Sequence, residues 1–447
     1  MEINESAAYL LKRLDEAGFE AYLVGGCVRD MLRGHEPKDW DLATSATPQQ
    51  VHGALSDLLI VDTGIKHGTV TVVLDDEHFE ITTFRTEGLY LDGRRPSSVS
   101  FVGSIHDDLA RRDFTINALA FSPSSGLIDP FGGRCDFEQG ILRAVGKPSE
   151  RITEDALRIM RALRFASTLG LDIAPDLAHS IHENRQALSA IAPERIRDEL
   201  VKLLPGKNIL AVLLEYPDVL AVPIPEIKPC VGLDQRSKYH CYNVWEHIAY
   251  AVASAVPDPL VRLTLLFHDF GKPERFAIDA AGVGHFYAHE EAGSRIAPAR
   301  LRELRFDNKT VETVTKLVKW HGTVLRAEDM PRWLNRLGLK GLRQLIEVKR
   351  GDMRAHSDIN MQERLETLLV VEKALEEYLA DEPCFTLATL AINGDDLRGL
   401  GLTEGPFIGE LLNTLLDAVL DGALENERAV LLSTARSLII NQMSALD

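Results

Sequence analysis

The sequence predicts an α+β fold in which a small mixed α/β head precedes a long all-α body. Between residues 20 and 145, short segments rich in β-branched residues alternate with helical segments, which is the pattern of a mixed sheet. After about residue 145, and most clearly between 240 and 380, apolar residues recur at helical spacing. Helices are therefore expected to form most of the chain behind the head.

The head is expected to begin with an amphipathic helix over residues 1–18. A second helix is expected after Thr47, which suits an N-cap and is followed by Pro48 at the first turn. Short apolar or alternating segments predict strands at 21–26, 40–44, 67–74 and 79–85.

Two helices are expected directly behind the head. The first is predicted over TEDALRIMRALRFASTLG, residues 153–170, with Thr153 as its cap and Gly170 as its stop. The second is predicted over PERIRDELVKLLPG, residues 193–206. The last segment, from residue 384, is typical of long helices separated by glycines.

Length and composition bound the class of protein. A chain of 447 residues suggests about two to four folded units. No apolar run approaches the ~20 residues of a membrane helix, and the N-terminus lacks a signal peptide, so a cytoplasmic protein without a membrane partner is expected. The five cysteines form no C-x-x-C pair, which argues against a disulfide framework or a zinc ribbon. The sequence leaves the oligomeric state open.

The net charge of −18, taken alone, argues against a nucleic-acid partner, because neutralising phosphates requires Lys and Arg. A local basic stripe can nevertheless lie on an acidic protein. The charge therefore excludes no partner, and the local sequence has to decide.

The stretch YLVGGCVRDMLRGHEPKDWDLAT contains the first candidate site. On one strand, Asp39 and Asp41 would point to the same face and repel each other unless a cation lies between them. Mg²⁺ prefers one or two carboxylates plus substrate phosphates. Gly25 and Gly26 let backbone N–H groups approach phosphates, and Arg29 adds a charge-assisted contact. This pattern predicts a site for a nucleoside triphosphate and its metal.

A D-x-D pair alone is common, and by itself it is as typical of a solvated loop beside a plain glycine turn. The Gly-Gly-x-x-Arg-Asp sequence in front of it favours the functional interpretation. Glu80 is either a third carboxylate on a neighbouring strand or an ordinary strand-face glutamate.

The segment EDALRIMRALR places four charged residues at three-residue steps, so that a helix would carry them on one side. An aspartate that accepts and an arginine that donates hydrogen bonds can match the Watson–Crick edge of a base. The same pair can also be an intrahelical ion pair that contributes little. The other arginines suit a triphosphate or an RNA backbone. The four residues are Asp155, Arg158, Arg161 and Arg164.

The body contains a set of histidines and aspartates in WEH, HDFGK, FYAHEE, VKWHG and RGDMRAH. Imidazoles mixed with carboxylates suit a divalent transition metal. An isolated histidine on an apolar helix is usually a core or surface residue, but His-Asp before Gly-Lys is more specific. The expected ligands are His247, His268, Asp269, His289, His321 and Asp352.

Taken in order, these motifs resemble those of the class II tRNA nucleotidyltransferases, the CCA-adding enzymes, and the related bacterial poly(A) polymerases. The resemblance rests on GGCVRD…DWDLAT, RRDFTINALAF, DPFGGRCDFEQGILRAVG, EDALRIMRALRFA and ERIRDELVKLL, and it extends into the tail. It implies a mixed-sheet nucleotidyltransferase head, an all-α neck that selects nucleotides and binds RNA, an HD-type body and a tRNA-binding tail. The implied boundaries are 1–142, 143–206, 207–380 and 381–447.

The resemblance also implies a reaction, the addition of C, C and A to the tRNA 3′ end from CTP and ATP with release of pyrophosphate. The paired aspartates would bind Mg²⁺ as the catalytic carboxylates. The nucleotide would be contacted by Gly26, Arg29 and Arg112, with Asp113 in support. Asp155 and Arg158 would read the base, and the two following arginines of the stripe would complete the pocket.

Three alternatives stay open within this resemblance. The first is CC-only addition. Against it, the segment at residues 85–101, RTEGLYLDGRRPSSVSF, resembles the flexible loop associated with adding the terminal A, which favours full CCA addition. An A-only enzyme is the second alternative. A poly(A) polymerase is the third, although EDALR is nearer to the CCA-type wording than EDPVR.

The histidines and aspartates of the body resemble, in their order, those of HD-domain phosphohydrolases. This likeness implies one or two divalent metals, such as Mg, Mn, Ni or Fe, and activity on phosphate monoesters or 2′,3′-cyclic phosphates, or else helices kept as a scaffold. A rival of another class is a metal phosphohydrolase whose head only binds RNA. His240 and His285 receive no role.

Overall fold

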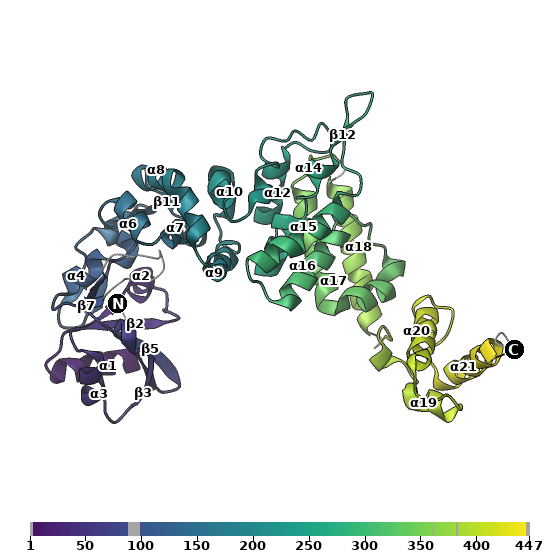
Figure 1. Ribbon diagram of the computed structural model, residues 1–447, viewed down its shortest axis with the longest axis horizontal. Coiled ribbons are helices and arrows are strands. Elements are labelled where there is room, and N and C mark those ends of the chain that lie inside the picture. The colour runs from purple at the N-terminus through teal and green to yellow at the C-terminus, as the bar shows by residue number, and fades with distance from the viewer. Residues whose placement is uncertain (1–2, 88–98, 360, 381–382, 444–447) are drawn as a thin grey trace. The chain divides into compact units, whose positions relative to one another are not determined.

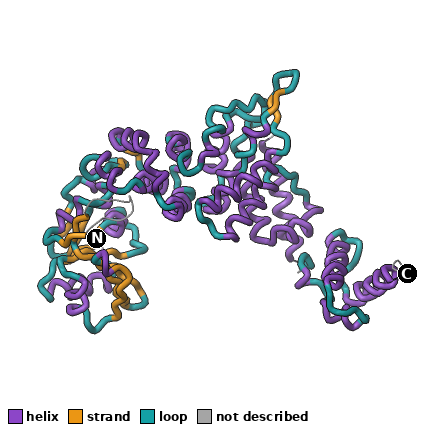
Figure 2. The backbone as a smooth tube through the Cα atoms, viewed as in Figure 1, coloured by secondary structure: helices purple, strands orange, loops and turns teal. Residues whose placement is uncertain are grey.

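The computed structural model describes residues 3–87, 99–359, 361–380 and 383–443. The chain divides into two compact units, Met1–Pro229 with Glu303–Phe306, and Cys230–Arg302 with Asp307–Asp447. Figures 1 and 2 show strands gathered in the first unit and helices dominating the second, which confirms the predicted α+β class. The four-part division implied by the sequence stays a prediction.

A seven-stranded mixed sheet forms the head, in the order β3-β4-β5-β2-β1-β8-β9. Its neighbours pair antiparallel except β2 and β5, which are parallel. The four expected strands are present, and three more complete the sheet. The strands are β1 (Ala21–Val24), β2 (Trp40–Thr44), β3 (Leu59–Gly64), β4 (Thr69–Leu74), β5 (Glu77–Thr83), β8 (Ala120–Ser122) and β9 (Gly126–Ile128).

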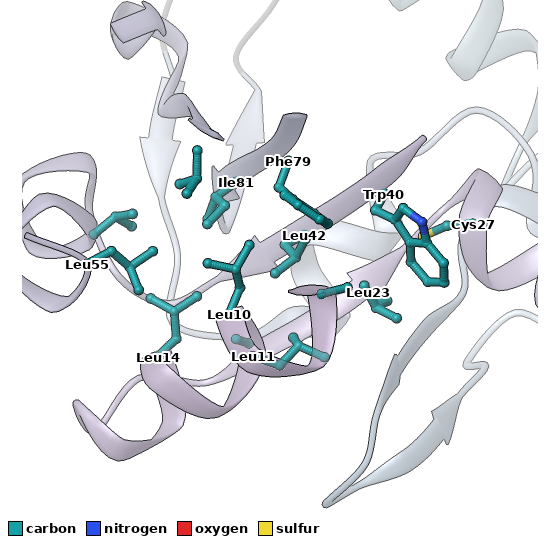
Figure 3. Close-up of a cluster of buried hydrophobic side chains, with 14 of the residues drawn as sticks. Leu10, Leu11, Leu14, Leu23, Cys27, Trp40, Leu42, Leu55, Phe79 and Ile81 are labelled. Carbon is teal, nitrogen blue, oxygen red and sulfur yellow. The ribbon is translucent and has the colours of Figure 1, made fainter. Parts of the chain in front are cut away.

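The helix α1 (Glu5–Glu16) closes one face of this sheet with its apolar side. Leu10 and Leu14 are fully buried in one cluster with Leu42 of β2 and Phe79 of β5 (Figure 3). Burying each such side chain stabilises the fold by about 1.5–3 kcal/mol. This core holds the middle of β2 in place, and β2 carries one of the candidate metal-binding aspartates.

The predicted start of α3 (Pro48–Ala54) is confirmed, because Thr47 caps it and Gln50 completes a capping box. The single helix predicted over 153–170 is wrong. Thr153 lies inside α6 (Pro148–Glu154), and its hydroxyl donates to the carbonyl of Ser149. Asp155 then adopts an extended backbone before α7 (Leu157–Phe165) begins.

The break at Asp155 has a local cause. Its carboxylate accepts from the backbone N–H of Leu157 at 3.0 Å, so it offers that amide a partner outside a continuous helix. A π-helical turn, Ala166–Gly170, follows α7 and ends at Gly170 with a φ of +71°, so the predicted stop is confirmed.

Helices form most of the rest of both units. In the first unit they include α2 (Gly26–Leu32), α4 (Ile105–Ala110), α5 (Gly133–Glu138), α8 (Pro175–Asn184), α9 (Pro193–Leu203), α10 (Ile209–Glu215) and α11 (Pro217–Leu220). In the second they include α12 (Val244–Ser254), α13 (Pro259–Phe267), α14 (Lys272–Arg275), α15 (His289–Glu303), α16 (Asn308–Trp320), α17 (Met330–Arg354), α18 (Met361–Ala380), α19 (Gly394–Gly399), α20 (Pro406–Leu420) and α21 (Arg428–Met443). Across the described ranges, no helix is both long and apolar enough to cross a membrane.

Candidate active site and metal cluster

Three carboxylates gather at one end of the parallel strand pair. Asp41 of β2 lies directly opposite Glu80 of β5 in the strand register. Asp39 immediately precedes β2, which begins at Trp40, so the expectation that both aspartates lie within the strand is wrong. Burial raises the pKa of Asp41, and the charges of Glu80 and Asp39 raise it further against the opposing effect of Arg112. A cation at this cluster would relieve that repulsion.

The glycine turn before α2 is required by both conformation and space. Gly25 has a φ of +74°, which side chains other than glycine rarely adopt. A Cβ on Gly25 would also lie 2.8 Å from the Nη1 of Arg112. The turn therefore brings backbone and guanidinium closer together than any other residue would allow.

A buried chain of hydrogen bonds links the glycine-turn arginine to α7. Arg29 Nη1 donates to Asn117 Oδ1 at 2.7 Å, and Asn117 Nδ2 donates to Asp113 Oδ1 at 3.1 Å. Arg161 lies 2.6 Å from the other oxygen of Asp113. Burial alone would raise the pKa of Asp113, but Arg161 and Asn117 lower it to about 2. Asn117 belongs to RRDFTINALAF, but no individual role was predicted for it.

Asp155 and Arg158 line the same pocket, although they do not share a helix face as predicted. Asp155 precedes α7 and is held by Arg195 of α9, whose Nη2 lies 2.8 Å from its Oδ2. Arg158 is buried and lies 2.6 Å from Glu154, and its Nη2 donates to the carbonyl of Arg111 at 3.0 Å. Arg195 was missed, and only its place in ERIRDELVKLL could have signalled it.

The two remaining arginines of the stripe do lie on α7, as predicted. Arg164 has its guanidinium carbon 4.0 Å from the ring centre of Phe165 and its Nε 2.5 Å from Glu199 of α9. Burial lowers the pKa of Arg164, and Glu199 opposes that effect. The stacked guanidinium and the acidic partner keep this cation fixed at the pocket wall.

These residues surround a pocket of about 490 Å³ in the first unit. Its lining combines an arginine-rich wall, the glycine turn and one strand carboxylate, so a strongly positive cavity lies on an acidic protein. Such a cavity suits a polyphosphate anion beside a metal. It is lined by Gly25, Gly26, Arg29, Asp41, Arg111, Arg112, Asp113, Asn117, Asp155, Leu157, Arg158, Arg161, Arg164, Phe165 and Arg195.

The second unit brings all six expected histidine and aspartate side chains together around Asp269. Its Oδ2 lies 3.3 Å from His247 Nε2 and 3.2 Å from His268 Nε2. Its Oδ1 lies 3.3 Å from His289 Nε2 and 3.8 Å from His321 Nε2. The two oxygens of one buried carboxylate thus face two different histidine pairs.

The spacing of these atoms suits two metal ions. Atoms bound to one metal at about 2.1 Å lie roughly 3 Å apart, and the Nε2 atoms of each histidine pair are 3.3 and 3.2 Å apart. Asp352 of α17 joins the first pair, with its Oδ1 3.0 Å from His247. His240, which received no role in the sequence analysis, and His356, the histidine of RGDMRAH, form a further group with His247.

A pocket of about 460 Å³ opens onto this cluster and is lined by Asp269, His289, His321 and Asp352. Lys272, Lys349 and Arg364 add positive charge to the same lining. The Lys272 ammonium lies 2.6 Å from Asp269. Cationic side chains beside candidate metal ligands suit a phosphate-containing ligand.

Comparison with protein families agrees with the two units. Residues 21–143 match the family described as the poly A polymerase head domain. Residues 170–228 match the family described as "Probable RNA and SrmB- binding site of polymerase A", and residues 293–435 match the family described as "tRNA nucleotidyltransferase domain 2 putative". Together with the mixed-sheet head and its pocket, these matches define a nucleotidyltransferase.

Individual relatives are similar over nearly the whole chain. A CCA-adding enzyme of Limosilactobacillus reuteri is 34% identical over 98% of this chain and 97% of its own. The crystal structure of the Bacillus stearothermophilus CCA-adding enzyme in complex with CTP is 30% identical, covers 98% of both chains and has a TM-score of 0.72. The Thermotoga maritima CCA-adding enzyme complexed with tRNA, at 20% identity and a TM-score of 0.56, shares the fold. The chain belongs to the CCA-adding enzyme family.

Proposed function

We propose that this protein adds C, C and A to the 3′ end of tRNA, using CTP, ATP and Mg²⁺ and releasing pyrophosphate. One observation carries the assignment of the site: a strand carboxylate, a glycine turn and an arginine-rich wall line a single pocket in the head. Solved CCA-adding enzymes that are similar to this chain are complexed with CTP, ATP or tRNA.

Asp39 and Asp41 would hold the Mg²⁺, with Glu80 beside them. When bound, the metal would neutralise charge on the triphosphate and favour ionisation of the attacking 3′-hydroxyl. The protein's own contribution is positioning. The glycine turn leaves room for the phosphates, and Arg29 and Arg112 place positive charge where the leaving pyrophosphate accumulates negative charge.

Asp155 and Arg158 would select the base. An acceptor and a donor that line the same pocket can bond to the edge of cytosine or adenine. Arg195 keeps the Asp155 carboxylate in place before a nucleotide arrives, and Glu154 does the same for Arg158. The hydrogen-bonding groups are therefore ordered in advance, which lowers the entropic cost of recognition.

The direct test supplies a tRNA lacking its CCA end with Mg²⁺ and with CTP and ATP, separately and together, and sizes the products to one nucleotide. Three added nucleotides followed by a stop support CCA addition. Two from CTP alone, or A only after a CC end, would make the enzyme a partial adder. A long ladder with ATP would make it a poly(A) polymerase.

The choice between full and partial addition stays a prediction. The loop expected at 85–101 lies largely outside the described residues, which include only its ends, β6 (Arg85–Glu87) and β7 (Val99–Phe101). The cytoplasmic location predicted from the N-terminal sequence is likewise a prediction.

A second activity, hydrolysis of phosphoesters at an HD-type binuclear metal site, is proposed for the second unit. The observation that favours it is the division of Asp269 between two histidine pairs, with spacings that suit metal ligands. The imidazole-rich set favours a transition metal such as Mn, Ni or Fe over Mg. The metals would supply an ionised water and neutralise the phosphate, while Lys272 and Arg364 would contribute charge to phosphate binding.

The test measures metal content and hydrolysis together. Purified protein is stripped of metal and reloaded with Mn²⁺, Ni²⁺ or Fe²⁺, then offered p-nitrophenyl phosphate and a 2′,3′-cyclic nucleotide. Metal-dependent turnover that is lost in Asp269→Asn supports the proposal. Bound metal without turnover on either substrate would leave the cluster with a structural role.

A further inference from the structure

Asp108 of α4 is a fully buried carboxylate next to the head pocket but outside the set of expected site residues. Its Oδ1 accepts from Arg111, at 3.0 Å from Nε and 2.8 Å from Nη2. Its Oδ2 accepts from Arg112 Nη2 at 3.2 Å. The backbone N–H of Arg85, at the start of β6, also lies 3.4 Å from Oδ1. One carboxylate thus holds two consecutive arginines of the pocket lining.

Arg111 and Arg112 contact different parts of the proposed nucleotide site. Arg112 also donates through Nη1 to the carbonyl of Asn117 at 3.3 Å, beside the turn at Gly25 where the triphosphate is expected. The carbonyl of Arg111 accepts from Nη2 of Arg158, the arginine assigned to base selection. Asp108 therefore contacts Arg112, which is expected at the triphosphate, directly, and is linked to Arg158, which is expected at the base, through Arg111.

We propose that Asp108 is a positioning residue that couples triphosphate binding to base selection, by fixing Arg112 directly and Arg158 through Arg111. The inference rests on the proposed nucleotide contacts of Arg112 and Arg158. Tightening of Arg112 onto a triphosphate is transmitted through the carboxylate to the Arg111 segment and so to the donors that meet the base. Binding of the correct base then strengthens binding of the phosphates, and binding of the phosphates strengthens selection of the base to the same extent.

The head contains another arginine-paired carboxylate that serves as a control. Asp57 Oδ1 lies 2.6 Å from Nη2 of Arg13 in α1. Neither Asp57 nor Arg13 lines the nucleotide pocket. Asp57→Asn therefore removes an arginine-paired charge from the head without touching the pocket.

The experiment compares Asp108→Asn with Asp57→Asn in the full-length enzyme. Single-nucleotide addition is measured on tRNA acceptors that end before the first C and before the A, with CTP, ATP, UTP and GTP. For Asp108→Asn, we expect KM for the correct nucleotide to rise about ten-fold, as losing a charge-assisted bond would produce. We also expect discrimination against UTP and GTP to fall in the same variant, whereas Asp57→Asn changes neither.

Arg112→Ala separates this inference from the site assignment. A KM that is unchanged in Arg112→Ala would overturn the nucleotide contacts themselves. If KM rises in Arg112→Ala but both KM and discrimination stay at wild-type values in Asp108→Asn, only the coupling role fails. A rise in KM for Asp108→Asn without any loss of discrimination also overturns the coupling. Loss of the carboxylate would then have no effect on base selection by Arg158.

Asp108→Glu keeps the test decisive if Asp108→Asn does not fold. Glutamate preserves the charge but moves it by one methylene, so the arginines stay paired in shifted positions. KM and discrimination should then change together, although less than in the amide variant. Wild-type values for both in a folded Asp108→Glu enzyme would contradict the proposal.

Discussion

Asp113 and Asp155 of the head pocket are paired with arginines, whereas Asp269 and Asp352 of the second unit face histidines. An arginine is a permanent cation, so the head pocket keeps its geometry without any metal. A neutral histidine is a metal ligand as readily as a hydrogen-bond partner. Two carboxylates are therefore fixed by permanent cations in the head pocket, whereas two in the second unit lie among side chains that suit a metal.

The exception inside the head makes the contrast sharper. Asp41 is half-buried near two further carboxylates, and its pKa is raised by burial and by their charge. It is the part of the head pocket that suits a metal, because a cation would relieve this repulsion. Removal of metal should therefore abolish chemistry in the head without unfolding it, and should loosen the helical unit around Asp269.

Asp41→Asn should give the largest effect. We expect nucleotide addition to fall by about a thousand-fold or more, because the metal loses a ligand while the amide retains the shape. The thermal stability of the apo protein should stay equal or rise, since a carboxylate with a raised pKa destabilises the folded state when it is ionised at neutral pH. Single-turnover CTP incorporation and a melting curve check the two parts. A clear drop in melting temperature would show that Asp41 is structural.

Asp269→Asn should remove metal from the second unit. We expect content measured by mass spectrometry to fall from about two transition-metal ions per chain to fewer than one, because the carboxylate serves both positions. CCA addition should remain within about two-fold of wild type, because the polymerase pocket lies in the other unit. His285→Ala, which changes a pocket-lining histidine outside the six ligands, is the control and should keep its metal. Full metal content in Asp269→Asn would refute the shared carboxylate.

Asp155→Ala should act on selectivity more than on chemistry. We expect the preference for CTP or ATP over the other nucleotides to fall by about ten- to a hundred-fold, because one of the two base-reading groups is lost. Mg²⁺ dependence should not change, since the metal ligands are intact. Competition assays on defined acceptor ends measure the preference. If the nucleotide preference were unchanged, the base-selecting role would be lost.

Arg195→Met tests base selection by Asp155 through the arginine that fixes its carboxylate. It leaves Asp155 in the pocket but without the guanidinium that fixes it, so we expect a smaller loss of selectivity than in Asp155→Ala. An equal loss of selectivity in Arg195→Met and Asp155→Ala would mean that Asp155 selects the base only when Arg195 fixes its carboxylate.

How far the sequence could predict these sites depended on how local each feature is. The six expected ligands of the second unit do lie close together, and they could be named from the sequence because His268 and Asp269 are adjacent and the other four lie in short distinctive motifs. The head strands β8 and β9 were missed because three residues are too few to show alternation. Asp155 was placed on a helix because its spacing fits one, and only its own hydrogen bond to Leu157 reveals the break.

The residues that hold the site were harder to predict than the residues that form it. The partners of three such residues, Asn117, Arg195 and Asp108, lie between 3 and 88 positions away in the sequence. Sequence periodicity does not predict contacts of this kind. Glu80 was left undecided, and the parallel pairing of β2 with β5 is what sets it beside Asp41. Tertiary pairings of this kind are fixed by sheet order, which the pattern of one strand does not contain.

Asp113→Asn should have the smallest effect, and it concerns stability. The pKa of Asp113 falls from an ordinary 3.8 to about 2 in the folded protein. A depressed folded pKa stabilises the protein above the unfolded value, and this stabilisation is lost as the pH falls from about 4 towards 2. A shift of this size corresponds to about 2 kcal/mol of unfolding free energy at neutral pH. Urea unfolding at pH 6 and at pH 3 should therefore show a smaller acid-induced loss in Asp113→Asn than in wild type. The control is Asp136→Asn, which changes another buried carboxylate of the head that is paired with an arginine, Arg143. An acid response in Asp113→Asn that equals the wild-type one would place the pH-sensitive charge elsewhere in the head.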